Sequence, residues 1–204
     1  MNETGASIMK IRTDFVTNSS SSSFILTIKF ELDNGETIMW EGKSDVGEGA
    51  YEYIQLSARK SPMELGQADS ISAMVEMLKE SVGEGIKEYE DEEPFKPIFD
   101  DKSGFVESLK QISSMEEIRK ITIEGYEDTF NDWEDGPEAF DEIVTYDLKT
   151  RVQTSVGVGN TWIESEGTGG ALDFARERVI KETPEGYFVE KRSKNYPDQE
   201  EELF

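Results

Sequence analysis

The chain has 204 residues, of which 45 are Asp or Glu and 21 are Lys or Arg, and its net charge is −24. It contains no His and no Cys, which excludes histidine general bases, thiolate nucleophiles and the usual zinc sites. The negative charge also argues against direct binding to nucleic-acid phosphates, because that binding depends on Lys and Arg. Carboxylates are left as the main reactive and recognition groups.

Hydrophobic residues make up 35% of the chain, enough to build a folded core. No stretch is long and apolar enough to span a membrane, and residues 1–12 lack the apolar stretch of a secretory signal. We expect a cytoplasmic protein of a bacterium or a phage-infected cell. We divide the chain into a flexible serine-rich segment (1–22), a single domain (23–196) with a possible division into two lobes near 84–102, and an acidic tail (197–204).

The first predicted element is a β-hairpin. Residues 23–32 are rich in β-branched and aromatic side chains, and the pattern resumes at 37–40. Between the two runs lies Asn34-Gly35, a pair that accepts the positive φ angles of a type I′ turn. Residues 51–56 predict a further strand.

Two helices follow. Residues 69–82 predict a helix with Asp69 as its N-cap and Gly83 and Gly85 as its stop signal. Residues 104–112 predict a second helix. The apolar stripe of the first helix consists of Ile71, Met74, Val75, Leu78 and Val82.

A short helical turn, one further strand and two hairpins complete the prediction. Ser114 and Glu117 have the spacing of a capping box, and the alternation in residues 120–125 predicts a strand. The last third predicts two hairpins, one from residues 142–147 and 149–156, the other from residues 178–181 and 187–191.

The glycine-rich segment 157–170 lies between these two hairpins. It matches neither the dinucleotide-binding nor the P-loop pattern, so we interpret it as a turn or mobile loop, followed by a helical turn at 171–177. Strands and helices do not alternate strictly along the chain. The sequence therefore predicts an α+β fold with a mostly antiparallel sheet, built from β-hairpins with two or three helices.

Residues 9–25 read MKIRTDFVTNSSSSSFI. The five serines 19–23 predict a surface loop ahead of a strand; a flexible linker, a modification target and a hydroxyl-rich anion site are alternatives. The segment resembles the opening of a group of small bacterial and bacteriophage proteins that has no assigned activity. The resemblance implies that Met9 is the natural start, that residues 1–8 are an extension, and that the protein belongs to a phage or mobile element.

The acidic residues concentrate in two segments. Residues 84–101 hold eight acids, and residues 124–142 hold nine acids and no base. Aromatic residues lie among them, as is typical of protein interfaces, although they could equally anchor their own segments in the core. We assign partner binding to Glu90, Asp91, Glu92, Glu93, Asp128, Phe130, Asp132, Trp133, Glu134 and Asp135, with Phe130 and Trp133 as anchors.

A calcium loop is the alternative interpretation of residues 131–142. Asn131, Asp135 and Glu142 occupy the first, fifth and twelfth positions of such a loop. Trp133, however, stands at the third position and cannot ligate a cation. We favour a solvated acidic loop, assign no metal or cofactor, and keep these three residues as weak metal candidates.

We therefore expect a non-catalytic acidic protein that binds a partner protein with a basic surface. In its sharpest form it is a phage or mobile-element inhibitor that engages the nucleic-acid-binding surface of its partner. A carboxylate-based metal-binding protein or Mg²⁺- or Ca²⁺-dependent hydrolase is one alternative. A structural or accessory protein, whose charge serves only solubility, is the other. No residue is assigned a catalytic role, and the sequence leaves the oligomeric state open.

Overall fold

The computed structural model describes residues 21–46, 53–87, 96–130, 138–165 and 168–195. Helices are written α, 3-10 turns η and strands β. The elements are β1 (Ser21–Leu32), β2 (Thr37–Val46), β3 (Tyr53–Ala58), α1 (Pro62–Gly66), α2 (Ile71–Ser81), β4 (Val82–Lys87), β5 (Lys96–Pro97), η1 (Asp101–Ser103), α3 (Phe105–Lys110), η2 (Met115–Glu117), β6 (Ile118–Phe130), β7 (Glu138–Asp147), β8 (Val152–Ser165), β9 (Thr168–Thr183) and β10 (Gly186–Asn195).

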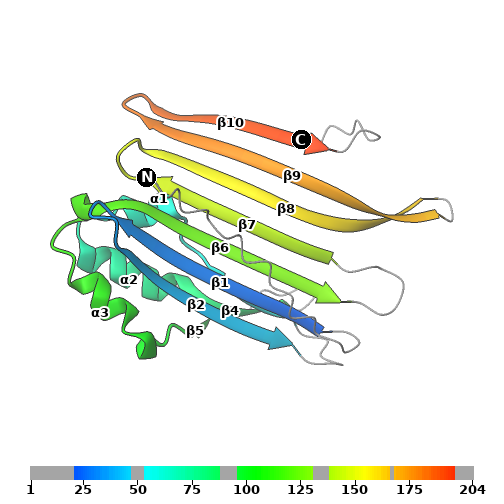
Figure 1. Ribbon diagram of the computed structural model, residues 1–204, viewed down its shortest axis with the longest axis horizontal. Helices are drawn as coiled ribbons and strands as arrows, with labels where there is room; N and C mark the ends of the chain where they lie inside the picture. Colours follow the sequence, from blue (N-terminus) through cyan, green and yellow to red (C-terminus); the bar gives the residue numbers. More distant parts are fainter. Residues whose placement is uncertain (1–20, 47–52, 88–95, 131–137, 166–167, 196–204) are drawn as a thin grey trace, which may run out of the picture.

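A seven-stranded antiparallel sheet dominates the structure, with strand order β10-β9-β8-β7-β6-β1-β2 (Figure 1). A smaller sheet has the order β3-β4-β5. The chain between β2 and β6 contains this small sheet and all three helices, and it returns to place β6 beside β1. The predicted α+β class, with a mostly antiparallel sheet and two or three helices, is confirmed.

The helices pack on one face of the large sheet. In β1, Leu26, Ile28 and Phe30 are buried, whereas the residues between them are partly exposed, as expected where one face of a strand packs on a core. On α2, Ile71, Met74, Val75 and Leu78 are buried, and on α3 the buried side chains are Phe105, Val106 and Leu109. Four residues of the predicted apolar stripe therefore lie on α2, whereas Val82, the fifth, lies in β4.

This helix layer extends only partway across the sheet. It ends at α1, which packs on β7 and β8: the buried Gln153 side chain accepts a hydrogen bond from the Met63 N–H at 3.0 Å, and the ring of Tyr146 lies against Gly66. No helix covers the outer strands β9 and β10 in Figure 1. We call the opposite side of the sheet, which bears Thr27 and Ile143, the open face.

The first hairpin is confirmed, but its predicted type I′ turn is wrong. Of the two central residues only Gly35 has a positive φ, at 88°. The Gly35 N–H donates to the Leu32 carbonyl at 3.0 Å, and the Asn34 side chain accepts from the Glu36 N–H at 2.9 Å. This side-chain bond supports a turn in which Asn34 keeps a negative φ.

Two predicted helix signals are also corrected. The N-cap of α2 is Ser70, whose hydroxyl accepts from the Ala73 N–H at 3.2 Å, and not Asp69. Val82 and the glycines after it do not simply stop the helix, because they form β4.

The capping box predicted at Ser114 is absent, because the Ser114 side chain makes no cap bond to η2. The Glu117 side chain instead accepts from the Ser113 N–H at 3.2 Å. A capping box does form at α1, between Ser61 and Glu64. The hydrogen bond from the Ser61 backbone is the main reason that the pKa of Glu64 lies below its ordinary value.

The predicted glycine-rich loop and helical turn are wrong. The chain runs through residues 157–165 as β8 and through residues 168–177 as β9. Gly157 pairs with Glu142 on one side and with Arg176 on the other. Glycine has a weak intrinsic preference for strands. Here the backbone of Gly157 is paired with both neighbouring strands, and this pairing outweighs that weak preference. Ser21–Ser23 likewise belong to β1 and not to a loop.

Gly66 provides a test of how α1 packs on the sheet. A Cβ at this position would lie 2.6 Å from Cδ1 and Cε1 of the Tyr146 ring. We therefore expect Gly66→Ala to lower the free energy of unfolding by about 1–3 kcal/mol, because an overpacked site must shift its neighbours. Thermal or urea unfolding measures the effect.

Gly125→Ala is the matched control, since a Cβ at Gly125 would meet nothing within 4 Å. We expect its stability to equal or slightly exceed that of the wild type. Equal losses in the two variants would show that α1 does not rest on Tyr146.

Candidate functional site

Most of the predicted partner-binding residues lie outside the described part of the chain. These are Glu90, Asp91, Glu92, Glu93, Asp132, Trp133, Glu134 and Asp135, together with the weak metal candidate Asn131. Asp128 and Phe130 lie at the end of β6, where their backbones pair with Ser23 and Ser21 of β1. Glu142 is an exposed residue of β7. The structure thus places three of the candidates on two neighbouring strands.

Strands flank residues 131–137 on both sides. β6 and β7 pair antiparallel up to Thr129 and Glu138, whereas a calcium loop of the EF-hand type lies between two helices. Among the described residues, no group of three or more acids is arranged to hold a metal ion. The flanking elements therefore favour a hairpin with acidic strands.

The β6–β7 hairpin carries a high density of carboxylates. From Ile121 to Leu148 the sequence contains no Lys or Arg. Six acids lie in the second half of β6 and the first half of β7: Glu124, Glu127, Asp128, Glu138, Asp141 and Glu142. Strand pairing fixes the backbone spacing of these acids, which a disordered acidic tract would not do.

An apolar pair lies in the open face, on β7 and β8. Ile143 of β7 pairs directly with Val156 of β8, and the two side chains are 37% and 39% exposed. Glu124 pairs with Ile143 on the other side, and Glu177 pairs with Val156. We call these four residues the Ile143–Val156 row.

A row of hydroxyls borders this apolar pair. Thr122, Thr145 and Thr154 are cross-strand partners on β6, β7 and β8, and the hydroxyls of Thr122 and Thr145 lie 3.1 Å apart in a hydrogen bond. The apolar centre is thus bordered by neutral hydroxyls and by the carboxylates at either end of its own row. An apolar centre with a polar rim is the arrangement found in protein interfaces.

The opposite end of the sheet is held together by cations. The Lys149 ammonium lies 2.7 Å from the Asp33 carboxylate and donates to the Glu116 carbonyl at 2.6 Å. Arg151 lies 3.6 Å from Glu182. These contacts join the turns at this end of the large sheet, so the charges there have structural partners.

Asp147 closes the β7–β8 turn within this end. Its carboxylate accepts from the N–H of Thr150 at 2.8 Å and from the N–H of Lys149 at 3.0 Å. Partial burial on its own raises the pKa of Asp147, but the hydrogen bonds from Thr150 and Lys149 and the positive charge of Lys120 together bring it below the ordinary value.

Tyr146 is the most strongly shifted group of the described residues. Burial first, and then the adjacent Glu182 carboxylate, raise the pKa of Tyr146 to about 12. Its hydroxyl donates to Glu182 at 3.2 Å. The phenol therefore stays protonated at physiological pH, and its hydroxyl has a structural role rather than that of a general base.

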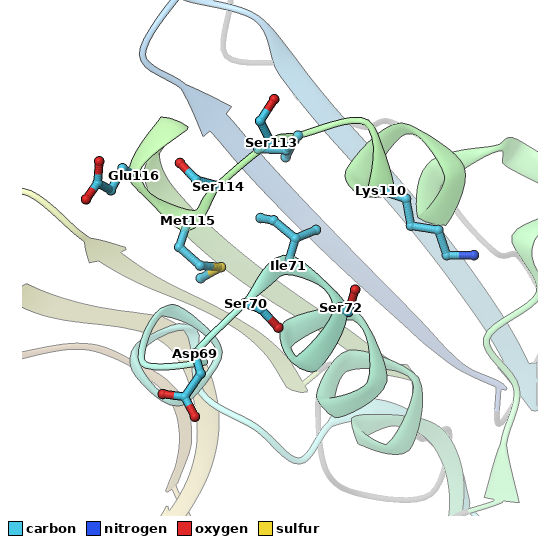
Figure 2. Close-up of a pocket in the computed structure, with 10 residues that line it drawn as sticks. Asp69, Ser70, Ile71, Ser72, Lys110, Ser113, Ser114, Met115 and Glu116 are labelled. Carbon is cyan, nitrogen blue, oxygen red and sulfur yellow. The ribbon is translucent and has the colours of Figure 1, made fainter.

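A separate hollow of about 790 Å³ lies where the start of α2 meets η2 and the end of α3 (Figure 2). Its walls contain the hydroxyls of Ser70, Ser72, Ser113 and Ser114. The partial positive charge at the start of α2 would favour an anion, but the carboxylates of Asp69 and Glu116 also line the hollow.

Lys110 does not neutralise the negative charge of these two carboxylates within the hollow. Its side chain extends away from the serines in Figure 2, and its ammonium lies 2.9 Å from Glu107. None of the described lining residues is a histidine that could serve the serines as a base, since the chain contains no His. The hollow is a polar depression without a set of convergent catalytic groups.

The comparisons with known proteins add no relationship, since no family model, curated protein or solved structure matches the chain. Among the described residues, no helix is long and apolar enough to cross a membrane.

Sequence reasoning missed Ile143 and Val156 as candidate binding residues. Both lie in strands that were predicted correctly, but alternation alone does not tell which face of a strand will be covered. A usable signal was present: in residues 142–147, apolar side chains occupy consecutive positions, so at least one of them must face away from the core.

Asp147 gives a prediction of pH dependence. Because its pKa is lower in the folded chain than in the unfolded chain, its carboxylate stabilises the fold above about pH 4, and this contribution disappears as the pH falls through the folded value. We expect Asp147→Ala to lower the free energy of unfolding by about 1–2 kcal/mol at pH 7 and by much less near pH 3. Urea unfolding at both pH values measures this.

Glu185→Ala, at the exposed tip of the next hairpin, is the control and should leave stability unchanged at both pH values. A loss in Asp147→Ala that is as large at pH 3 as at pH 7 would contradict the role of the charged carboxylate.

Proposed function

We propose that this protein is a non-catalytic binding protein that engages the basic surface of a partner protein through its open face. The observation that carries the proposal is the Ile143–Val156 row, in which two exposed apolar side chains lie between two carboxylates. The apolar pair would supply the dehydrated centre of the interface, and the acids would select a basic partner.

Electrostatics supports the choice of partner. A net charge of −24 attracts a basic protein over a distance of about 10 Å at moderate ionic strength, and such steering accelerates association. The base-free β6–β7 hairpin lies beside the apolar pair. Steering and docking would therefore act on the same region of the molecule.

The partner class follows from the same chemistry. Carboxylates held at fixed spacing on a sheet resemble the repeated charges of a nucleic-acid backbone, and a groove that binds phosphates offers Lys and Arg to both. The N-terminal resemblance suggests a phage or mobile-element protein. We therefore propose an inhibitor of a host protein that handles nucleic acid.

Affinity capture from a bacterial host lysate tests this proposal. We expect the full chain to retain a basic protein at 50 mM salt and to release most of it at 500 mM, because screening weakens the attraction. An excess of duplex DNA should compete for the same partner. The double variant Ile143→Ser/Val156→Ser should weaken binding by about tenfold or more, as removal of a central apolar contact does.

Gln111→Ser is the control, because Gln111 is exposed at the end of α3, in the helix layer on the other side of the large sheet. It should bind like the wild type. The proposal is wrong if the captured partner is insensitive to salt and DNA, or if the double variant binds it as tightly as the control does.

A further inference from the structure

The outermost strand of the large sheet exposes three consecutive apolar side chains. Tyr187, Phe188 and Val189 of β10 are 60%, 62% and 43% exposed. Successive residues of a strand point to opposite faces, so apolar surface is presented on both sides of the same strand. Since β10 is the last strand in the sheet order, this surface lies along an edge.

Edge strands expose backbone N–H and C=O groups that can pair with another strand, and proteins usually protect them with charges, bulges or prolines. Here such protection is confined to the second half of β10. Residues Gly186 to Val189 contain neither a charged residue nor a proline, whereas Lys191, Arg192 and Lys194 follow. The first half therefore combines unprotected backbone groups with large apolar side chains.

The Tyr187 ring is also held in place. Its hydroxyl accepts a hydrogen bond from the Gln67 side chain at 3.2 Å, which ties the end of the ring to the residue that follows α1. The ring remains more than half exposed. A side chain already fixed in this way loses less conformational freedom when a partner covers it.

Charge determines which partner fits this edge. Two copies of a chain with a net charge of −24 repel each other over most of their surfaces. Residues 171–196, which contain most of β9 and all of β10, hold five acids against six bases. The β10 edge is therefore a place where a second copy meets little of that repulsion.

We propose that two copies of this chain form a dimer by antiparallel pairing of their β10 strands about a two-fold axis at Val189. In this register each Val189 faces the Val189 of the second copy. Tyr187 faces Lys191 of the second copy, and Phe188 faces Glu190. The pairing covers all three exposed apolar side chains and places Lys191 beside an aromatic ring, a favourable contact for an ammonium.

The alternative symmetric registers are less favourable. An axis at Glu190 would place two carboxylates opposite each other, and an axis at Lys191 would place two ammonium groups there; like charges directly opposite each other destabilise a strand pair. An axis at Phe188 would pair only residues 186–190 of each strand, because β10 begins at Gly186, whereas the axis at Val189 pairs residues 186–192. The axis at Val189 avoids both the like charges and the shorter pairing. The two large sheets would then join into one continuous sheet, and the Ile143–Val156 row would remain uncovered on each copy.

Analytical ultracentrifugation of the full chain tests the dimer. We expect a concentration-dependent dimer for the wild type at micromolar concentrations, and a dissociation constant raised by about tenfold or more in Val189→Lys, which places two like charges at the axis. Met39→Lys is the control, because it changes a more exposed apolar residue on β2, the opposite edge strand. It should dimerise like the wild type.

A wild-type monomer at 100 µM would overturn the proposal. Equal loss of the dimer in Val189→Lys and Met39→Lys would also overturn it, because that result would indicate head-to-tail pairing between β10 and β2. Melting temperatures of all three proteins show whether a variant has lost its fold.

A cross-link provides a test that does not depend on destabilising the chain. The protein has no cysteine, so Val189→Cys introduces a single thiol. Directly facing residues of antiparallel strands have Cα atoms about 4.5–5.5 Å apart, a distance that a disulfide can span. We expect mild oxidation to give a covalent dimer of Val189→Cys and none of Met39→Cys; equal cross-linking of both would refute the proposed register.

Discussion

The fold depends on the contact between one face of the β2-β1-β6 part of the large sheet and the layer formed by α2, α3 and the small sheet. Phe30 of β1 is fully buried there, with its ring centroid 6.0 Å from that of Phe105 on α3. Phe99 joins Phe105 to Trp40 of β2, at centroid distances of 5.7 and 5.1 Å. This aromatic group fastens the segment before α3 to the sheet. Each such buried side chain contributes about 1.5–3 kcal/mol to stability.

Because the layer formed by α2, α3 and the small sheet covers only the β2-β1-β6 part of the large sheet, the strands in the other part of the sheet lack this cover. β8, β9 and β10 extend the sheet by strand pairing, beyond the cover that α1 provides at Tyr146 and Gln153. On the helix side of the sheet, apolar side chains of β10 are therefore exposed, as at Tyr187 and Val189. The proposed dimer edge lies in this half, and the proposed partner surface reaches into it from β6 and β7 on the open face. The same arrangement that leaves these strands uncovered thus makes them available for binding.

Local signals in the sequence were sufficient for much of the fold. The helix around Val75 and the hairpin at Gly35 follow from periodicity and turn chemistry, which depend on neighbouring residues. The strands through Gly157 and Gly170 could not be predicted in the same way, because their partners are fixed by long-range pairing. The candidate site was harder still: whether Ile143 is buried or exposed depends on which face of the sheet the helix layer covers, which no local pattern records.

Side-chain footprinting with hydroxyl radicals tests most directly whether the helix layer leaves the open face uncovered. The comparison is made within the β6–β7 hairpin of the full chain, between Ile143, which is 37% exposed, and Ile121, which is fully buried. The account predicts rapid modification of Ile143 and Val156 and strong protection of Ile121. Equal protection of Ile143 and Ile121 would show that the open face is covered and would contradict the account.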